Sequence, residues 1–285
     1  MIPAGRHVVP VSRYSDVHRL YTVGDCHLGN VGCSTDHLRA DIERIRKDPL
    51  ARALLMGDLA DYIGQTDKRW DAATITPRAR VKDLADWGMY LSKLVVQTFA
   101  PIAGKIIGAL SGNHEATFQA RQAQQCHAWT CQELGIRDLG YSCFLDLCFS
   151  RRTPGSKTGK TRRYRLFCHH GAGAASSAGG KINRLMAFMM ANEADLFLVG
   201  HVHEKDVKRT ETLSANDTCT ALTSCKKLGV FTGTYLRTYH EGTNAGYGER
   251  AGYRPVPLGC SLVEFQPFDR NWIHRDESVS ARVAI

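Results

Sequence analysis

The 285-residue sequence predicts an α/β fold in which two sheets pack within one domain. In the first half, apolar strand-like runs alternate with segments of helical spacing, which favours parallel pairing of the strands. In the second half, short strands separated by turn signals dominate. No linker separates the two halves, so we expect residues 1–285 to form a single domain.

The first half contains three expected strands and three expected helices. The expected strands cover residues 19–23, 51–56 and 105–110. The expected helices cover residues 36–47, 81–99 and 116–134. In the first helix, Leu38, Ile42 and Ile45 have helical spacing, and Pro49 follows just beyond the end. Gly135 ends the third helix.

The second half is expected to be mostly β-structure. Residues 141–149 and 162–168 form two strands of a long hairpin in this prediction, and residues 180–191 form a helix. The remaining expected strands cover residues 196–199, 204–213, 218–225, 228–237 and 259–266. We therefore expect two sheets packed in one domain.

Composition and cysteine spacing exclude several classes of protein. Hydrophobic content of 43% and charged content of 23% exclude a collagen, a coiled coil and a mostly disordered chain. No apolar run approaches the roughly 18 residues needed to cross a bilayer, and residues 1–14 lack the apolar region of a signal peptide. The ten cysteines include no C-x-x-C pair. We therefore expect reduced thiols, a cytoplasmic location and no membrane partner.

The excess positive charge is local. The chain carries 37 basic and 28 acidic residues, a formal net charge of +9. Seven of the basic residues lie between positions 151 and 165, where no acidic residue occurs. This basic hairpin, residues 150–165, offers Arg151, Arg152, Arg162 and Arg163 as candidate contacts for substrate phosphates. The alternative is a solvated loop that only aids solubility.

Polar residues follow five of the expected strands. The fragments are Gly24-Asp25-Cys26-His27, Gly57-Asp58-Leu59-Ala60-Asp61, Gly112-Asn113-His114-Glu115, His169-His170-Gly171 and Gly200-His201-Val202-His203. A single Gly-Asp after a strand is usually only a turn, but five such fragments are hard to reach by chance. Ligands of open α/β sheets bind at the carboxyl ends of strands. Carboxylate, imidazole and amide oxygen suit Mn²⁺, Zn²⁺ or iron.

The order D-x-H, G-D-x-x-D, G-N-H-E, H-G, G-H-x-H resembles the calcineurin-like metallophosphoesterase family over about residues 19–266. The resemblance implies a two-sheet β sandwich flanked by helices, in the four-layer order α/β/β/α. It also implies a centre for two metal ions. The implied ligands are Asp25, His27 and His203 for the first ion, Asn113, His170 and His201 for the second, and Asp58 for both.

The resemblance also implies two catalytic residues. His114 would be the general acid, and Asp61 would orient its ring. His169 and His170 are adjacent, and the family ligand is usually the histidine just before glycine, which favours His170. Purple acid phosphatase-like members are set aside, because His27 fills their D-x-G position and Tyr62 stands one residue late for their tyrosine.

Two metal ions about 3.5–4 Å apart can clamp the attacking and leaving oxygens of an in-line displacement, and their shared water becomes the nucleophile. We therefore expect a two-metal-dependent phosphoesterase, with Mn²⁺ as the first choice and Zn²⁺, iron, Co²⁺, Ni²⁺ and Mg²⁺ as alternatives. The expected substrate is a phosphodiester of nucleic acid or nucleotides. The alternatives are a phosphomonoesterase acting on a phosphoprotein or small metabolite, and a binding scaffold without catalysis.

Three further segments remain. Residues 155–161 are similar to a P-loop but have one residue too few between the glycines and lie between two expected strands, so we reject nucleotide-triphosphate binding there. The glycine-rich residues 171–180 form either a connecting loop or a close approach for phosphate, and Asn183 and Arg184 follow as candidate substrate contacts. The Tyr/Arg/Gly-rich loop, residues 237–258, either stacks bases or packs on the body. This loop faintly resembles metallophosphoesterases of phage and prophage origin, and no site residue rests on that likeness.

Overall fold

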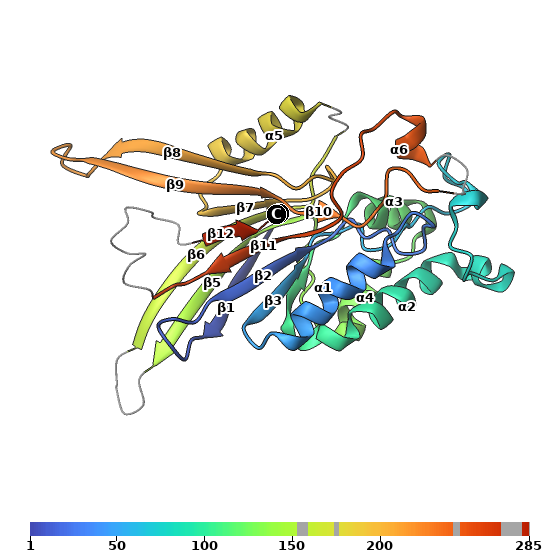
Figure 1. Ribbon diagram of the computed structural model, residues 1–285, viewed down its shortest axis with the longest axis horizontal. Coiled ribbons are helices and arrows are strands. Elements are labelled where there is room, and N and C mark those ends of the chain that lie inside the picture. The colour runs from blue at the N-terminus through green and yellow to red at the C-terminus, as the bar shows by residue number, and fades with distance from the viewer. Residues whose placement is uncertain (153–158, 174–176, 242–245, 269–280, 285) are drawn as a thin grey trace.

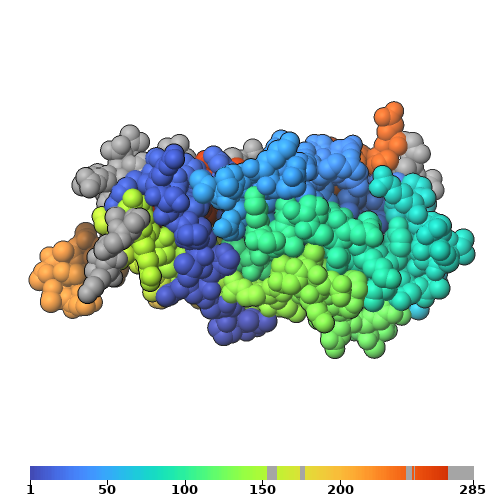
Figure 2. All heavy atoms as spheres, turned by 90° about the horizontal axis from the view of Figure 1, so that it is seen from below, coloured from blue at the N-terminus to red at the C-terminus, as the bar shows by residue number. Residues whose placement is uncertain are grey.

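Two mixed β-sheets, each of six strands, form the centre of the structure (Figure 1). The computed structural model describes residues 1–152, 159–173, 177–241, 246–268 and 281–284. The prediction of a two-sheet α/β fold is confirmed. Helices pack against both sheets, and the β8–β9 hairpin projects at one end of the molecule (Figures 1 and 2).

The first sheet contains strands from the beginning and the second half of the chain. In spatial order, its strands are β1 (Ile2–Pro10), β5 (Ser142–Arg152), β6 (Gly159–His169), β7 (Leu196–Val199), β9 (Leu222–Phe231) and β8 (Val207–Ala215). The hairpins β5–β6 and β8–β9 are antiparallel, and β6, β7 and β9 run parallel to one another.

The second sheet contains the three expected strands of the first half. In spatial order, its strands are β10 (Gly233–Thr234), β11 (Gly259–Phe265), β2 (His18–Val23), β3 (Ala51–Leu55) and β4 (Ile106–Ala109), and β12 (Ala281–Ala284) also pairs with β11. Strands β2, β3 and β4 run parallel. Their carboxyl ends therefore lie at one edge of this sheet.

A shared apolar core joins the two sheets. Leu20, Leu54 and Ile107 of the second sheet belong to the same buried cluster as Leu166 and Leu198 of the first. All five side chains are at most 2% exposed. Burial of this size, at roughly 25 cal/mol per Å² of apolar surface, holds the sheets face to face.

Helices cover further apolar surface of each sheet. Against the second sheet pack α1 (Thr35–Lys47), α2 (Trp87–Phe99) and α4 (Cys126–Leu134), and against the first sheet packs α5 (Ala178–Ala191). The other helical segments are α3 (Asn113–Gln122), α6 (Tyr247–Arg250), η1 (Ala72–Thr74), η2 (Val81–Asp86) and η3 (Ala100–Lys105). Helix α1 has acidic residues in its first turn and basic ones in its last, which suits the helix dipole.

The structure differs from the expected elements in four places. Strand β1 was not expected, and the expected helix 116–134 is two helices separated at Ala123, whose φ is +55°. The expected helix 81–99 begins as the 3₁₀ segment η2. The expected strands 218–225 and 228–237 are largely one strand, β9.

Candidate metal centre

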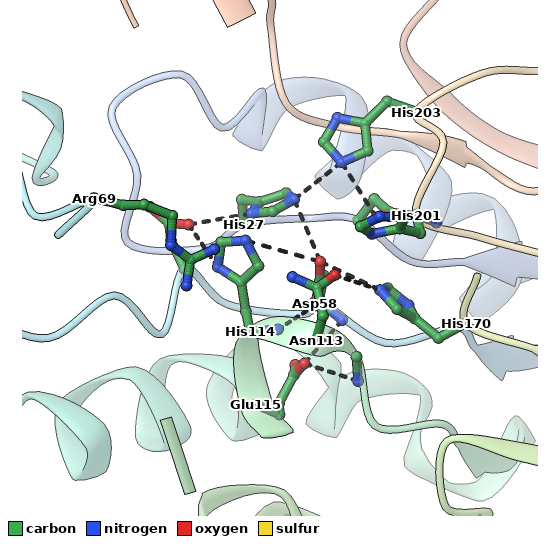
Figure 3. A network of polar contacts seen from close by, with 12 residues as sticks. His27, Asp58, Arg69, Asn113, His114, Glu115, His170, His201 and His203 are labelled. Carbon is green, nitrogen blue, oxygen red and sulfur yellow. Dashed lines mark hydrogen bonds and ion pairs between the residues drawn. The ribbon is translucent and has the colours of Figure 1, made fainter. Parts of the chain in front are cut away.

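The residues expected to bind metal converge from five loops of the two sheets. Asp25 and His27 follow β2, Asp58 follows β3, Asn113 and His114 begin α3 after β4, His170 follows β6, and His201 and His203 follow β7. Figure 3 shows the histidine rings pointing toward Asp58 from different sides. Segments far apart in the sequence thus bring their polar side chains to one place.

The backbone at this place is conformationally strained. Asp25, His27, Asp58, His201 and His203 all have φ between +47° and +69°, a region that residues with a side chain seldom adopt. Such conformations cost about 1 kcal/mol or more each and cluster at functional sites. Since the fold maintains all five, their side-chain directions must matter.

Asp25, His27 and His203 form the first cluster. His203 Nε2 lies 3.2 Å from Asp25 Oδ1 and 3.2 Å from His27 Nε2. His27 Nδ1 lies 3.2 Å from Asp61 Oδ1. Because a carboxylate only accepts hydrogen bonds, Nδ1 carries the proton and Nε2 presents its lone pair to the cluster.

Asp58, His170 and His201 form the second cluster. His170 Nδ1 donates to the Met56 carbonyl at 2.7 Å, so Nε2 is the acceptor when the ring is neutral, the form in which histidine binds a metal ion. That Nε2 lies 3.3 Å from Asp58 Oδ2 and 3.1 Å from Asn113 Oδ1. Three acceptor atoms therefore face one another. In each cluster the possible ligand atoms lie within 4.8 Å of one another.

The chemistry of these side chains fits divalent cations. Asp25 is fully buried, and in the described part of the chain its Oδ1 has no aligned hydrogen-bond donor, His203 Nε2 at 3.2 Å being out of alignment. A buried acceptor without a donor is costly unless a cation approaches it. Together with the acceptor nitrogens of His27 and His170, this oxygen makes a donor set suited to Mn²⁺, Zn²⁺ or iron. The two clusters can therefore hold metal ions.

The buried aspartate and histidine side chains of the centre strongly shift one another's pKa values. Burial alone would raise the pKa of Asp58, but His170, His114 and His27 together hold it well below its usual value. Burial lowers the pKa of His170, but the Asp58 charge raises it more, to about 10. Burial lowers the pKa of His27. Asp58 is thus an anion that the surrounding imidazoles stabilise.

His114 lies beside the clusters with Asp61 behind its ring. Its Nδ1 lies 3.1 Å from Asp61 Oδ1, although not in hydrogen-bonding alignment, and its Nε2 lies 4.0 Å from Asp58 Oδ2. Burial lowers the pKa of His114, but Asp58 and Asp61 raise it more, to about 9. His27, Asp58 and His114 also form a third group with possible ligand atoms within 4.8 Å of one another.

Sequence reasoning assigned no role to Glu115 or Asn30, which support the centre. Glu115 is buried and accepts hydrogen bonds from the backbone N–H groups of Asp58, Leu59 and Gly112 at 2.8–3.0 Å. Asn30 donates to Asp61 Oδ2 at 2.8 Å. Glu115 is the third residue after the N-cap Gly112, a position from which a glutamate can accept from the N-cap N–H, and that position could have identified it.

Two glycines of the motifs allow the loops to approach closely. A Cβ on Gly57, whose φ is +88°, would lie 2.6 Å from His170 Nδ1 and 2.7 Å from the Gly112 nitrogen. A Cβ on Gly112 would lie 2.1 Å from Asp58 Oδ1. A larger residue at either position would push these ligands apart.

The adjacent histidines have different environments. His170 belongs to the second cluster, whereas His169 packs on Phe188 with ring centroids 4.6 Å apart. His169 Nδ1 accepts from the Gly171 N–H at 2.8 Å. The structure therefore brings His170 to the centre and leaves His169 beside the helix α5.

The basic hairpin does not lie beside the centre, contrary to what its closeness in sequence to His170 suggests. β6 is extended, so Arg162 stands seven residues and, at about 3.3 Å per residue, about 23 Å from His169. Arg163 is paired with Asp146 at 2.9 Å, and Arg151 stacks over Tyr14 at 4.1 Å. Arg152 ends β5 at the same remote end. Residues 153–158, including most of the P-loop-like run, lie outside the described residues.

Of the two candidates on α5, Arg184 comes nearest to the centre. Its guanidinium packs over Gly173, where an added Cβ would lie 2.1 Å from Nη1. The Gly173 carbonyl in turn lies 3.2 Å from His201 Nε2. Asn183 is exposed on the same turn. In the Tyr/Arg/Gly-rich loop, Arg254 pairs with Glu204, next to His203, so this part of the loop packs on the body.

No protein-family model matches the chain, and no curated protein was found to match it. The two-sheet α/β fold and the Asp/His clusters are compatible with a metallophosphoesterase. Among the described residues, none of the helices has the length and apolar character to span a bilayer.

Proposed function

We propose that this protein is a two-metal-dependent phosphoesterase of the calcineurin-like kind, with the four-layer order α/β/β/α. The observation that carries the proposal is that the Asp25–His27–His203 cluster lies next to the Asp58–His170–His201 cluster, with His27 Nε2 4.0 Å from Asp58 Oδ2, beside an imidazole that faces a second carboxylate. One ion would be held by Asp25, His27, His203 and Asp58, and the other by Asp58, Asn113, His170 and His201. Mn²⁺ is the first ion to test.

The residues around the ions have distinct tasks in this mechanism. Divalent ions would supply charge stabilisation to the phosphate and lower the pKa of water. Asp61 fixes the His27 ring through Nδ1 and holds the Nδ1 side of His114. The Nε2 atom of His114 is therefore the one able to pass a proton to the leaving oxygen. Burial raises the pKa of Asp61, but its contacts with His114 and His27 hold it well below its usual value, so it remains an anion.

We propose a phosphodiester of nucleic acid or nucleotides as the substrate class. The local excess of positive charge at residues 151–165 supports an anionic polymer. Because the four candidate arginines of this basic hairpin are about 20 Å or more from His169 along the extended strand, they would contact a long strand far from the bond that is cleaved. Arg184, close to His201, is the candidate for phosphates nearer the centre.

Hydrolysis of bis-p-nitrophenyl phosphate and of p-nitrophenyl phosphate with Mn²⁺ tests the proposal and separates diesterase from monoesterase. Asp58→Asn should abolish turnover and weaken Mn²⁺ binding measured by calorimetry, because the carboxylate proposed to contact both ions is lost. His114→Gln should reduce turnover by about 10²–10⁴-fold while Mn²⁺ binding is retained.

His37→Gln is the matched control, since His37 is an exposed histidine on α1 whose side chain is hydrogen-bonded to that of Ser34. Wild-type activity in His114→Gln would contradict the acid role. Loss of Mn²⁺ binding in that variant would make His114 a ligand instead. Absence of turnover on both esters and on single-stranded DNA, double-stranded DNA and RNA, with Mn²⁺ bound, would refute the proposed function.

A further inference from the structure

Beyond these residues, the geometry points to Arg69 as an anion-binding group, and we propose that it holds a non-bridging oxygen of the substrate phosphate on the His114 side of the centre. This inference rests on the proposed function for its substrate. Neither a motif nor the resemblance to a family indicates Arg69, which stands eight residues after Asp61 in a loop. Figure 3 draws Arg69 on the side of the centre where His114 lies, and the charge of Arg69 acts on His114.

The position of Arg69 is fixed by a buried carboxylate. Arg69 Nε and Nη2 lie 3.1 and 2.9 Å from the two oxygens of Asp67, a bidentate pair. The Asp67 side chain is only 3% exposed, and Arg121 Nη1 approaches it from the other side at 3.0 Å. The guanidinium of Arg69 is therefore not a freely moving surface cation.

The anchor connects Arg69 to the helix that carries His114. Arg121 belongs to α3, the helix that begins with Asn113 and His114. Gln122, the last residue of α3, donates to Thr66 Oγ1 of the same loop at 2.7 Å. Arg69 and His114 are thus fixed relative to each other through α3.

One side of the guanidinium remains available to a ligand. In the part of the chain that the structure describes, Arg69 Nη1 has no hydrogen-bond or ion-pair partner. The side chain is 32% exposed. The charges of Asp61 and Asp58 act on Arg69, and the charge of Arg69 acts on His114, so it lies within electrostatic reach of the centre. A planar donor held in this way suits a phosphate oxygen.

A purely structural role is the alternative. Arg69 would then only neutralise Asp67 and keep the loop on α3. Arg121 neutralises the same carboxylate from the last turn of α3, the opposite end of the helix from His114, so the two arginines can be compared directly. Only the proposed role requires the Nη1 donor.

The experiment uses the full-length protein loaded with Mn²⁺ and inorganic phosphate as the probe, with affinity measured by calorimetry. Arg69→Gln should weaken phosphate binding about 10-fold or more, because a charge-assisted hydrogen bond is lost. Arg69→Lys should recover part of the affinity, since it keeps the charge but not the planar fork. Arg80→Gln, which changes an exposed arginine paired with Asp83, should bind phosphate like wild type, and Arg121→Gln, which loosens the Asp67 anchor but keeps the Nη1 donor of Arg69, should lose less affinity than Arg69→Gln.

Each result decides the matter. Unchanged phosphate affinity in Arg69→Gln, or an equal loss in Arg121→Gln, would overturn the inference. So would a wild-type protein that binds Mn²⁺ but no phosphate. If phosphate binding depends on Arg69 while no phosphate ester is hydrolysed, the proposed function fails and the anion site stands. If esters are hydrolysed and the Arg69 variants match wild type in kcat and KM, only the inference fails.

Discussion

Replacing Glu115 by Gln isolates the contribution of one buried carboxylate to the centre. Its Oε2 accepts from Asp58 N–H at 3.0 Å and from Gly112 N–H at 2.9 Å, and its Oε1 accepts from Leu59 N–H at 2.8 Å. A glutamine has only one acceptor oxygen, so its NH₂ group must face at least one of these donors. One buried N–H then lacks a partner, at about 1–3 kcal/mol, and the remaining bonds lose their charge assistance.

We therefore expect Glu115→Gln to lower the free energy of unfolding by about 2–4 kcal/mol. At roughly 2 °C for each kcal/mol, the melting temperature should fall by about 4–8 °C. Urea unfolding followed by tryptophan fluorescence measures this change. Mn²⁺ affinity should fall as well, because Glu115 holds the Asp58 backbone against the start of α3.

Glu133→Gln provides the matched control, because Glu133 is exposed on α4. It makes the same chemical change where water can solvate the amide. If Glu115→Gln unfolds at the same urea concentration as Glu133→Gln and binds Mn²⁺ like wild type, the three backbone hydrogen bonds do not stabilise the centre.

Three further predictions follow from other features. Burial lowers the pKa of His127, but Asp138 and Cys131 together raise it more, to about 10. The His127–Asp138 pair therefore contributes its full stability below about pH 6.5, and this contribution is lost as the pH rises through 10. Asp138→Asn should therefore lower the free energy of unfolding by about 1–2 kcal/mol at pH 6, since water partly screens the half-exposed Asp138, and by almost nothing at pH 10.5. An equal loss at both pH values would contradict this. His18 is buried, neither ring nitrogen has a partner among the described residues, and burial lowers its pKa. His18→Leu should raise the free energy of unfolding by about 1 kcal/mol at pH 7. The gain should be larger below pH 6.5, where His18 of the wild type binds a proton in the unfolded chain but not in the folded one. Denaturation midpoints at pH 5 and 7 test this. His203→Gly relieves the strain at φ of +50°, so without added metal the variant should be as stable as wild type or more stable. The rise in melting temperature on adding Mn²⁺ should be smaller than in wild type. A decrease of more than about 1 kcal/mol in the free energy of unfolding without metal would contradict this.

The centre could be predicted from sequence because its residues follow buried, regular strands. An apolar run that ends at Gly24 or Gly57 indicates both the end of a strand and a tight turn, and parallel strands bring such ends to one edge. The short motifs therefore identified Asp25, Asp58 and their neighbours without tertiary information. Their mutual distances needed the structure.

Strand β1 could not be predicted, for a physical reason. Only Val9 of its residues is buried, and Pro3 and Gly5 interrupt any alternation. Its pairing partner is β5, about 140 residues later in the chain. A half-exposed edge strand of this kind depends on long-range pairing rather than on its own pattern.

The break between α3 and α4 could not be predicted from the sequence either. Ala123 takes a left-handed conformation at the end of α3, although alanine is a strong helix former. No glycine or proline marks the break. The contacts of Gln122 with Thr66 and of Arg121 with Asp67, both in the loop before η1, accompany this bend. Arg69 was missed for the same reason, since only these tertiary contacts relate it to His114.

The backbone strain and the buried charge of the centre point to the same conclusion. Five residues at positive φ cost about 5 kcal/mol or more in sum, comparable to the net stability of many domains. Glycine would remove that cost at each position, yet aspartate or histidine stands at all five. The shared core of the two sheets must offset this cost in the folded protein. A scaffold that only needed the fold would gain stability by losing these side chains, so their presence argues for a task that requires their ligand atoms.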